Sequence, residues 1–261
     1  MLAGVWRYRS FVLGMVRREF QARYLHSVLG SAWAVLNPLA LIVIYTVVFG
    51  RVLHPRVPGG DDRLAYAIFL CAGVIAWTLF TEVVSRCVTV FIEHANLLKK
   101  ASFPRATLPA IVLLSAALNF GIVFGLLLIF LALTGRFPGW SVLAFVPLVL
   151  VQQSIALGLG VTLGIVNVFF RDVAHVVTIV LQLWFWLTPI VYPEDILAEP
   201  IRRLLGLNPL TQLVRAYQQI VLSGTWPDWS AYLLPSLCAA AALGIGIVTF
   251  RRLAGEMVDC L

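Results

Sequence analysis

The residues of this 261-residue chain that could carry out chemistry are few and lie far apart. No histidine has another histidine or a cysteine at the spacing of metal ligands, and the four are His26, His54, His94 and His175. A phosphate-binding loop needs a glycine-rich turn followed by Lys-Ser or Lys-Thr, whereas the only lysines, Lys99 and Lys100, precede Ala101. No Gly-x-Ser-x-Gly nucleophile motif is present. The sequence therefore predicts no metal site, no cofactor and no enzyme active site in this chain.

Composition places the chain in a membrane. Hydrophobic residues make up 61% of it and charged residues 12%, whereas soluble domains carry about 25% charged residues. Runs free of Asp, Glu, Lys and Arg predict six transmembrane helices. We expect them at 31–53, 64–86, 106–134, 140–166, 173–193 and 229–250, with a Gly/Pro turn at 134–139 between the third and the fourth. The predicted fold class is an all-α integral membrane protein with a single transmembrane domain.

Basic residues predict the orientation of these spans. Twelve of the 19 Lys and Arg residues fall on the side of the two termini, and seven fall on the other side. The positive-inside bias therefore places both termini in the cytoplasm of a multi-pass protein of the cell inner membrane. The basic residues flank the spans and form no long run, so the net charge of +7 indicates anionic lipid or an acidic partner rather than nucleic acid.

Two segments outside the spans predict helices at the cytoplasmic surface. At 7–24, apolar residues recur three and four apart between arginines, which is typical of an amphipathic helix lying along the membrane. This helix is either a simple anchor or a gate or docking helix for a partner. At 91–100, an acidic start and a basic end favour a short helix, and the alternative is a solvated connector.

The stretch after the fifth span predicts a re-entrant helical hairpin at 194–224. Pro189 and Pro193 end the span, and the two apolar segments that follow are each too short to cross about 30 Å of hydrocarbon. Broken backbone at membrane depth is tolerated only where protein buries it or where it lines a water-filled cavity. We therefore expect the hairpin to lie beside a pathway.

Local motifs indicate where helices begin and end. In Asn208-Pro209, Asn is a favoured cap and Pro is tolerated at the first helical position, so the pair predicts the start of the second half-helix of the hairpin. Gly224 predicts its end. By the same rule, Asn37-Pro38 predicts a helix start within the first span.

Small and polar residues inside the spans predict contacts between helices. The spacings Gly121-x-x-x-Gly125 and Ala156-x-x-x-Gly160-x-x-x-Gly164 allow helix backbones to approach closely. The first interpretation is packing within the subunit, and the second is a dimer contact. Glu82 is the one carboxylate in the predicted spans. It either reaches the inner interface or lies deeper in the membrane. At the deeper position it would be paired or would face a cavity.

Taken together and in order, eight short motifs resemble the membrane subunit of type-2 ABC exporters. They are REFQARY at 18–24, LGSAW at 29–33, LNPL at 36–39, NLLKK at 96–100, FPR at 103–105, NVFFRD at 167–172, TPIVY at 188–192 and NPL at 208–210. Each motif is weak alone, but the set covers nearly the whole chain. The branch it most resembles exports lipid-linked polysaccharides such as O-antigen and teichoic acid.

The resemblance implies a homodimer of six-helix subunits that docks on two copies of a separate ATPase subunit, which binds ATP and Mg. The helix at 7–24 becomes the interface helix and the helix at 91–100 the coupling helix. Contact with the ATPase is expected from residues of that second segment, namely Glu93, His94, Asn96, Lys99 and Lys100. The first and fifth spans are expected to line the channel, and the hairpin at 194–224 is its outer gate.

The resemblance also implies the substrate. This is an undecaprenyl-pyrophosphate-linked polysaccharide that is moved from the cytoplasmic to the outer side of the inner membrane. O-antigen is the first candidate. Teichoic acid, capsule glycan and drug or small-molecule export are the alternatives. The lipid head group would be drawn by Arg17, Arg18 and Arg23, and sugar rings would slide past aromatic faces. The expected aromatic residues are Tyr45, Phe49, Trp184, Trp186 and Tyr192.

Overall fold

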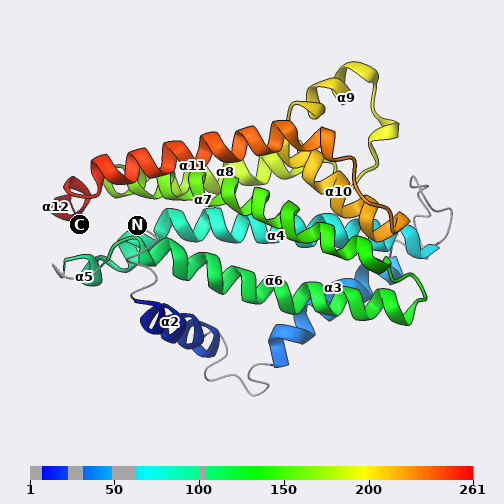
Figure 1. Cartoon of the computed structure of the whole chain (residues 1–261), viewed down its shortest axis with the longest axis horizontal. Coiled ribbons are helices and arrows are strands. Elements are labelled where there is room, and N and C mark those ends of the chain that lie inside the picture. Colours follow the sequence, from blue (N-terminus) through cyan, green and yellow to red (C-terminus); the bar gives the residue numbers. More distant parts are fainter. Residues whose placement is uncertain (1–7, 23–31, 49–62, 100–103, 261) are drawn as a thin grey trace.

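The computed structural model describes residues 8–22, 32–48, 63–99 and 104–260, and within these ranges every regular element is a helix (Figure 1). The α-helices are α2 (Arg9–Ala22), α3 (Trp33–Val48), α4 (Arg63–Glu93), α5 (Ala95–Leu98), α6 (Thr107–Leu133), α7 (Phe145–Phe169), α8 (Val173–Trp186), α9 (Glu199–Gly206), α10 (Pro209–Ser223), α11 (Leu233–Leu253) and α12 (Glu256–Cys260). Three short 3-10 helices join them: η3 (Gly139–Ala144), η4 (Glu194–Ile196) and η5 (Trp229–Tyr232). The predicted all-α class is confirmed for the described residues.

Among the described residues, four helical stretches are long and apolar enough to cross a membrane. They are Leu64–Glu93, Thr107–Leu133, Gly139–Phe169 and Trp229–Leu253, and they correspond to the second, third, fourth and sixth predicted spans. The helices within the first and fifth predicted spans are shorter, with 16 residues in α3 and 14 in α8. The chain is thus a multi-pass membrane protein, and the full set of six spans stays a prediction.

Helix α4 forms the centre of the bundle. In its most apolar window 72% of the residues are buried, against 17% for α6. Helices α3, α6, α7, α8 and α10 all pack on it. Because α4 meets helices on so many sides, it links segments that are far apart in the sequence.

Glycines set how closely α7 approaches its two neighbours. A Cβ atom at Gly160 would lie 2.6 Å from the Cβ of Cys87 on α4, and one at Gly164 would collide with the Cys87 carbonyl oxygen. Gly158 faces α11 instead, where an added Cβ would lie 2.6 Å from the Leu243 nitrogen. The small residues of α7 therefore pack within the subunit, as their spacing predicts.

The other predicted small-residue pair behaves differently. Around Gly121 and Gly125 of α6, no described atom outside the local helix lies within 4 Å of an added Cβ. The two glycines do not bring α6 against a neighbour in the described part of the subunit.

The predicted turn between the third and fourth spans is present. Gly135 and Gly139 adopt φ angles of 72° and 67°, a left-handed conformation that glycine adopts without steric cost. The end of α10 lies against this turn, since a Cβ at Gly224 would be 3.4 Å from the Pro138 carbonyl oxygen. We call this end of the bundle the hairpin end.

Several predicted helix boundaries differ from the observed ones. Helix α8 ends at Trp186, before Pro189, rather than at residue 193. Helix α4 continues beyond residue 86 to Glu93 because Cys87 and Phe91 are buried against α7. The predicted helix at 91–100 is accordingly divided between the last residues of α4 and the single turn α5. The helix start predicted at Asn37-Pro38 is wrong, since α3 begins at Trp33 and holds Pro38 inside it. The missing proline N–H removes one backbone hydrogen bond, and membrane helices tolerate this where their surroundings compensate.

Candidate functional site

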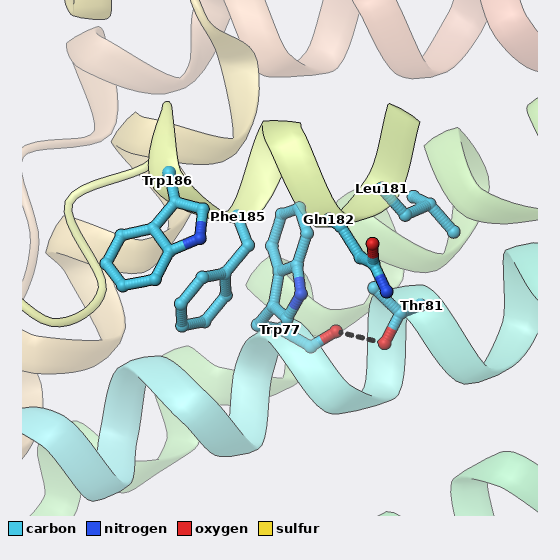
Figure 2. A pocket seen from close by; sticks show the side chains of 6 residues that line it. All are labelled: Trp77, Thr81, Leu181, Gln182, Phe185 and Trp186. Carbon is cyan, nitrogen blue, oxygen red and sulfur yellow. Dashed lines mark hydrogen bonds between the residues drawn. The ribbon is translucent and has the colours of Figure 1, made fainter. Parts of the chain in front are cut away.

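A pocket of about 420 Å³ opens between α4 and α8 (Figure 2). Trp77 and Thr81 of α4 form one wall. The other wall comes from α8 and consists of Leu181, Gln182, Phe185 and Trp186. The Trp77 ring meets Phe185 edge-on at a centroid distance of 5.8 Å, and Phe185 meets Trp186 in the same way at 5.4 Å. Three aromatic rings from the two walls thus form one continuous apolar surface.

Polar groups lie at one side of this surface. Figure 2 shows the amide of Gln182 next to Thr81. The Thr81 hydroxyl donates to the Trp77 carbonyl oxygen at 3.0 Å, which leaves its lone pairs able to accept, and a Gln amide both donates and accepts. Aromatic faces are electron-rich and attract the partial positive charge of C–H groups. The pocket therefore suits a ring with an apolar face and hydroxyl groups at its edge.

The backbone after α8 is not helical, and side chains satisfy its carbonyl groups. Tyr66 donates to the Val191 carbonyl oxygen at 2.6 Å, and Gln218 donates to that of Pro189 at 3.3 Å. The Tyr192 hydroxyl donates to the Trp186 carbonyl oxygen at 2.7 Å. Broken backbone buried in a membrane protein needs such partners because unsatisfied polar groups are costly there.

Asn208 joins this segment to α10. Its side-chain oxygen accepts from the backbone N–H of Leu210 and from the indole N–H of Trp184, each at 3.1 Å. Its amide nitrogen donates to the Leu187 carbonyl oxygen at 3.2 Å and to the Thr188 hydroxyl at 3.1 Å. The predicted cap is therefore confirmed, and the same side chain also ties α10 to the end of α8.

We expect Asn208→Ala to loosen this joint. The change removes the helix cap, which is worth about 1 kcal/mol, and leaves the Trp184 indole N–H without its acceptor. The thermal stability of the purified protein in detergent should fall. Asn208→Asp keeps the acceptor for Leu210 and Trp184 but loses both donated bonds. Its stability should therefore lie between that of the parent protein and that of Asn208→Ala. Equal stability of Asn208→Ala and the parent would contradict this role.

Helix α10 is held inside the bundle. The Tyr217 hydroxyl donates to the side-chain oxygen of Gln152 at 2.7 Å, and Gln152 in turn donates to the Ala76 carbonyl oxygen at 2.7 Å. All three residues are buried. At the surface, Arg215 pairs with Glu194 through two nitrogen atoms, which ties α10 to the start of the hairpin. Tyr217, Gln152 and Ala76 thus connect α10, α7 and α4 in one hydrogen-bonded chain.

The structure separates the predicted channel aromatics. Trp186 lines the pocket, and the Tyr192 hydroxyl bonds to the Trp186 backbone. Trp184 instead packs edge-on against Phe80 at 5.5 Å and bonds to Asn208, so it is a structural contact. Phe49 and the side chain of Tyr45 lie outside the described residues.

Of the six pocket residues, only Trp186 was predicted from the sequence; the other five are Trp77, Thr81, Leu181, Gln182 and Phe185. Trp77 and Thr81 are four residues apart on α4, and Gln182 precedes Phe185 by three on α8, so each pair shares a helix face. This spacing was the available signal, but it does not say which faces of the two helices meet.

A polar cluster attaches α2 to the bundle. The Glu19 carboxylate accepts from Arg86 of α4 at 2.5 Å and from the Ser115 hydroxyl of α6 at 2.6 Å. Glu82 lies 3.7 Å from Arg86 and accepts from Asn119 at 3.1 Å. Glu82 is thus paired with Arg86 and Asn119, and its depth in the membrane stays a prediction. We refer to these five residues as the polar cluster.

The predicted head-group and ATPase contacts lie on the surface where they are described. Arg17 and Arg18 are exposed on α2, and Arg23 lies outside the described residues. Around α5, His94 is partly buried, while the exposed residues are Glu93, Asn96 and Lys99. Lys100 lies outside the described residues. These roles stay predictions.

Comparison with known proteins identifies the family of this chain. The ABC-2 type transporter family matches residues 11–222, a range that contains the pocket, Asn208 and the polar cluster. This chain belongs to the ABC-2 type transporter family. It is 32% identical over 226 residues to the O-antigen export system permease protein RfbA of Myxococcus xanthus, covering 86% of this chain and 85% of the relative. A permease of the same name from Klebsiella pneumoniae is 29% identical over 212 residues, with 81% and 80% covered.

A more distant relative is the polysialic acid transport protein KpsM of Escherichia coli. It is 24% identical over 238 residues, which cover 90% of both chains. Membership of the ABC-2 type transporter family confirms the resemblance found in the sequence and makes the chain a membrane transport component that requires an ATPase partner.

Proposed function

We propose that this chain is the permease of an ATP-driven exporter that moves a lipid-linked polysaccharide across the inner membrane to its outer side. O-antigen is the first candidate for this polysaccharide. The observation that carries the proposal is the pocket between α4 and α8, whose aromatic rings and adjacent amide match the apolar face and the hydroxyl groups of a sugar ring. The similarity to two O-antigen export permeases supports the same substrate class.

The pocket can act on each sugar of a long chain in turn. Trp186 and Gln182 are exposed at its mouth, so a ring can enter without unfolding the helices. A contact between two aromatic rings is worth about 0.5–1.5 kcal/mol, and we take the same order for a sugar ring on an aromatic face. Conduction needs binding that is favourable enough to admit the substrate and weak enough to release it, and such contacts meet both conditions.

The subunit functions within a larger assembly. We propose a homodimer whose channel is lined by the first and fifth spans, so that the exposed side of α8 faces the second copy. That side carries Val176, Ile179, Val180, Leu183 and Leu187. Two ATPase subunits, which hold ATP and Mg, dock on the cytoplasmic side against α2 and α5, and both termini lie there. The hairpin that holds α10 is the outer gate, and its bonds to α8 through Asn208 support this role.

Arg17 and Arg18 of α2 would draw the pyrophosphate of the lipid carrier. Both are exposed on the helix, and Val12 and Val16 are buried on the opposite side. Arginine binds phosphate groups through charge-assisted hydrogen bonds. A capsule polysaccharide is the alternative substrate, and it is favoured by the similarity to the polysialic acid transport protein.

The test is export of surface polysaccharide in a strain that lacks the native gene. Deletion should remove the polysaccharide from a gel of surface glycans and cause lipid-linked precursor to accumulate. A plasmid copy with both Trp186→Ala and Gln182→Ala should restore about three- to tenfold less polysaccharide than the parent, which is the fold-change expected for the loss of about 1 kcal/mol of stacking.

Trp140→Ala is the matched control because Trp140 is an exposed aromatic residue outside the pocket. This variant should export normally at equal amounts of inserted protein. Normal surface glycan in the deletion strain, without precursor, would reject the proposed substrate. Normal export by the double variant would reject the role of the pocket but not the proposed substrate.

A further inference from the structure

The two helices of the predicted hairpin have different surroundings. Helix α10 is buried along its length, with nine of its residues in the core. Helix α9 stands apart from the bundle toward the hairpin end (Figure 1) and packs on α10, where Leu205 is buried. Only one of the two therefore sits inside the protein as a re-entrant helix would.

Helix α9 is amphipathic and shows most of its apolar side to its surroundings. Ile201, Leu204 and Leu207, with Ile196 just before the helix, are between 49% and 70% exposed. The polar side holds Glu199 and Arg203, which form an ion pair at 3.1 Å. Leu205 is the buried residue of α9, so the exposed aliphatic side chains need another apolar environment.

Tryptophans indicate where the bilayer surface lies. At the hairpin end, Trp140, Trp226 and Trp229 are exposed near the starts of helices α7 and α11. Tryptophan is enriched where the hydrocarbon meets the head groups. Figure 1 shows α9 toward the same end of the bundle.

We propose that α9 lies in the membrane surface at the hairpin end, with Ile201, Leu204 and Leu207 among the lipid chains and Arg203 among the head groups. An amphipathic helix with arginine on its polar side binds bilayers in this way. The positive charges of Arg202 and Arg203 exceed that of Glu199, which complements lipid phosphates. The bilayer surrounds the spans on every side that protein does not cover, so it is already in place.

By itself, this face is too small for a stable protein interface. Each partner in such an interface buries about 800 Å², which the four aliphatic side chains of one short helical segment do not reach. A lipid contact has no such threshold because each buried CH₂ contributes independently. Anchored in this way, α9 holds one end of α10 to the bilayer while the rest of α10 is held by protein.

Spin labels can test this location in the full-length protein in nanodiscs of phosphatidylethanolamine and phosphatidylglycerol. Cys238 and Cys260, which are not buried, are first replaced by alanine, while Cys71 and Cys87 are buried. A label is then attached to Leu204→Cys or, as the matched control on the polar side of α9, to Arg203→Cys. Collisions with oxygen report lipid exposure, and collisions with a water-soluble nickel chelate report exposure to water.

The label at position 204 should collide with oxygen at least about threefold more often, relative to nickel, than the label at position 203. Equal nickel access at the two positions would place α9 in water and overturn the proposal. A label at 204 that is immobile and shielded from both reagents would place a second copy or another protein on this face, which also overturns it.

Discussion

Gly158→Ala and Gly164→Ala should each lower the free energy of unfolding by about 1–3 kcal/mol. An added methyl group at Gly158 collides with the backbone of Ala242 and Leu243, and one at Gly164 collides with the Cys87 carbonyl oxygen. Backbone atoms cannot rotate away as a flexible side chain can, so α7 must separate from α11 or from α4. The loss is measured as a lower temperature at which the detergent-solubilised protein aggregates.

Gly121→Ala and Gly125→Ala are the matched controls for these variants. Both glycines lie in the interior of α6, and an added Cβ at either position meets no described atom within 4 Å. Alanine favours helix over glycine by about 1 kcal/mol, so these variants should be as stable as the parent or more stable. The packing model fails if Gly164→Ala is as stable as Gly125→Ala.

Arg86→Ala should release α2 from the bundle. Arg86 is the cation that joins Glu19 of α2 to Glu82 of α4, and the side chains of these three residues are 27%, 23% and 15% exposed. Removing one partner of a buried ion pair costs about 3–5 kcal/mol. Partial exposure reduces this, and we expect about 2 kcal/mol. Hydrogen exchange of the amides in α2 should become faster.

Arg18→Ala tests whether the effect is specific. Arg18 is adjacent to Glu19 in the sequence but exposed, so its removal should change stability by less than about 0.5 kcal/mol. Arg86→Lys keeps the charge and should restore part of the protection. If exchange in α2 is the same in Arg86→Ala as in the parent, the polar cluster does not hold this helix.

The aromatic residues illustrate how much of the candidate site could be predicted. The sequence pointed to the end of the fifth span, and Trp186 does line the pocket. It did not separate Trp186 from Trp184, two residues earlier, which packs against Phe80 and Asn208. The wall formed by Trp77 was not predictable because Trp77 and Phe185 are 108 positions apart, and only the approach of α4 to α8 brings them together.

The two Asn-Pro pairs illustrate the same limit for the helices. Asn208 caps α10 as predicted because the preceding helix α9 ends at Gly206 and Asn208 itself has an extended backbone, so its side chain can accept from Leu210. At Asn37-Pro38 the same local signal failed because the residues before it also form helix, from Trp33 onward. A cap motif predicts a start only where the preceding residues leave the helix.

The sequence by itself determined the membrane class, four long apolar helices, the turn at Gly135 and Gly139, and the cap at Asn208. These features depend on composition and on residues within a few positions of each other. Only the tertiary structure decided that Gly158 and Gly164 pack while Gly121 and Gly125 do not, and that Glu82 is paired with Arg86 and Asn119. Such contacts depend on which helix faces meet, and that is set by the packing of the whole bundle rather than by the spacing within one helix.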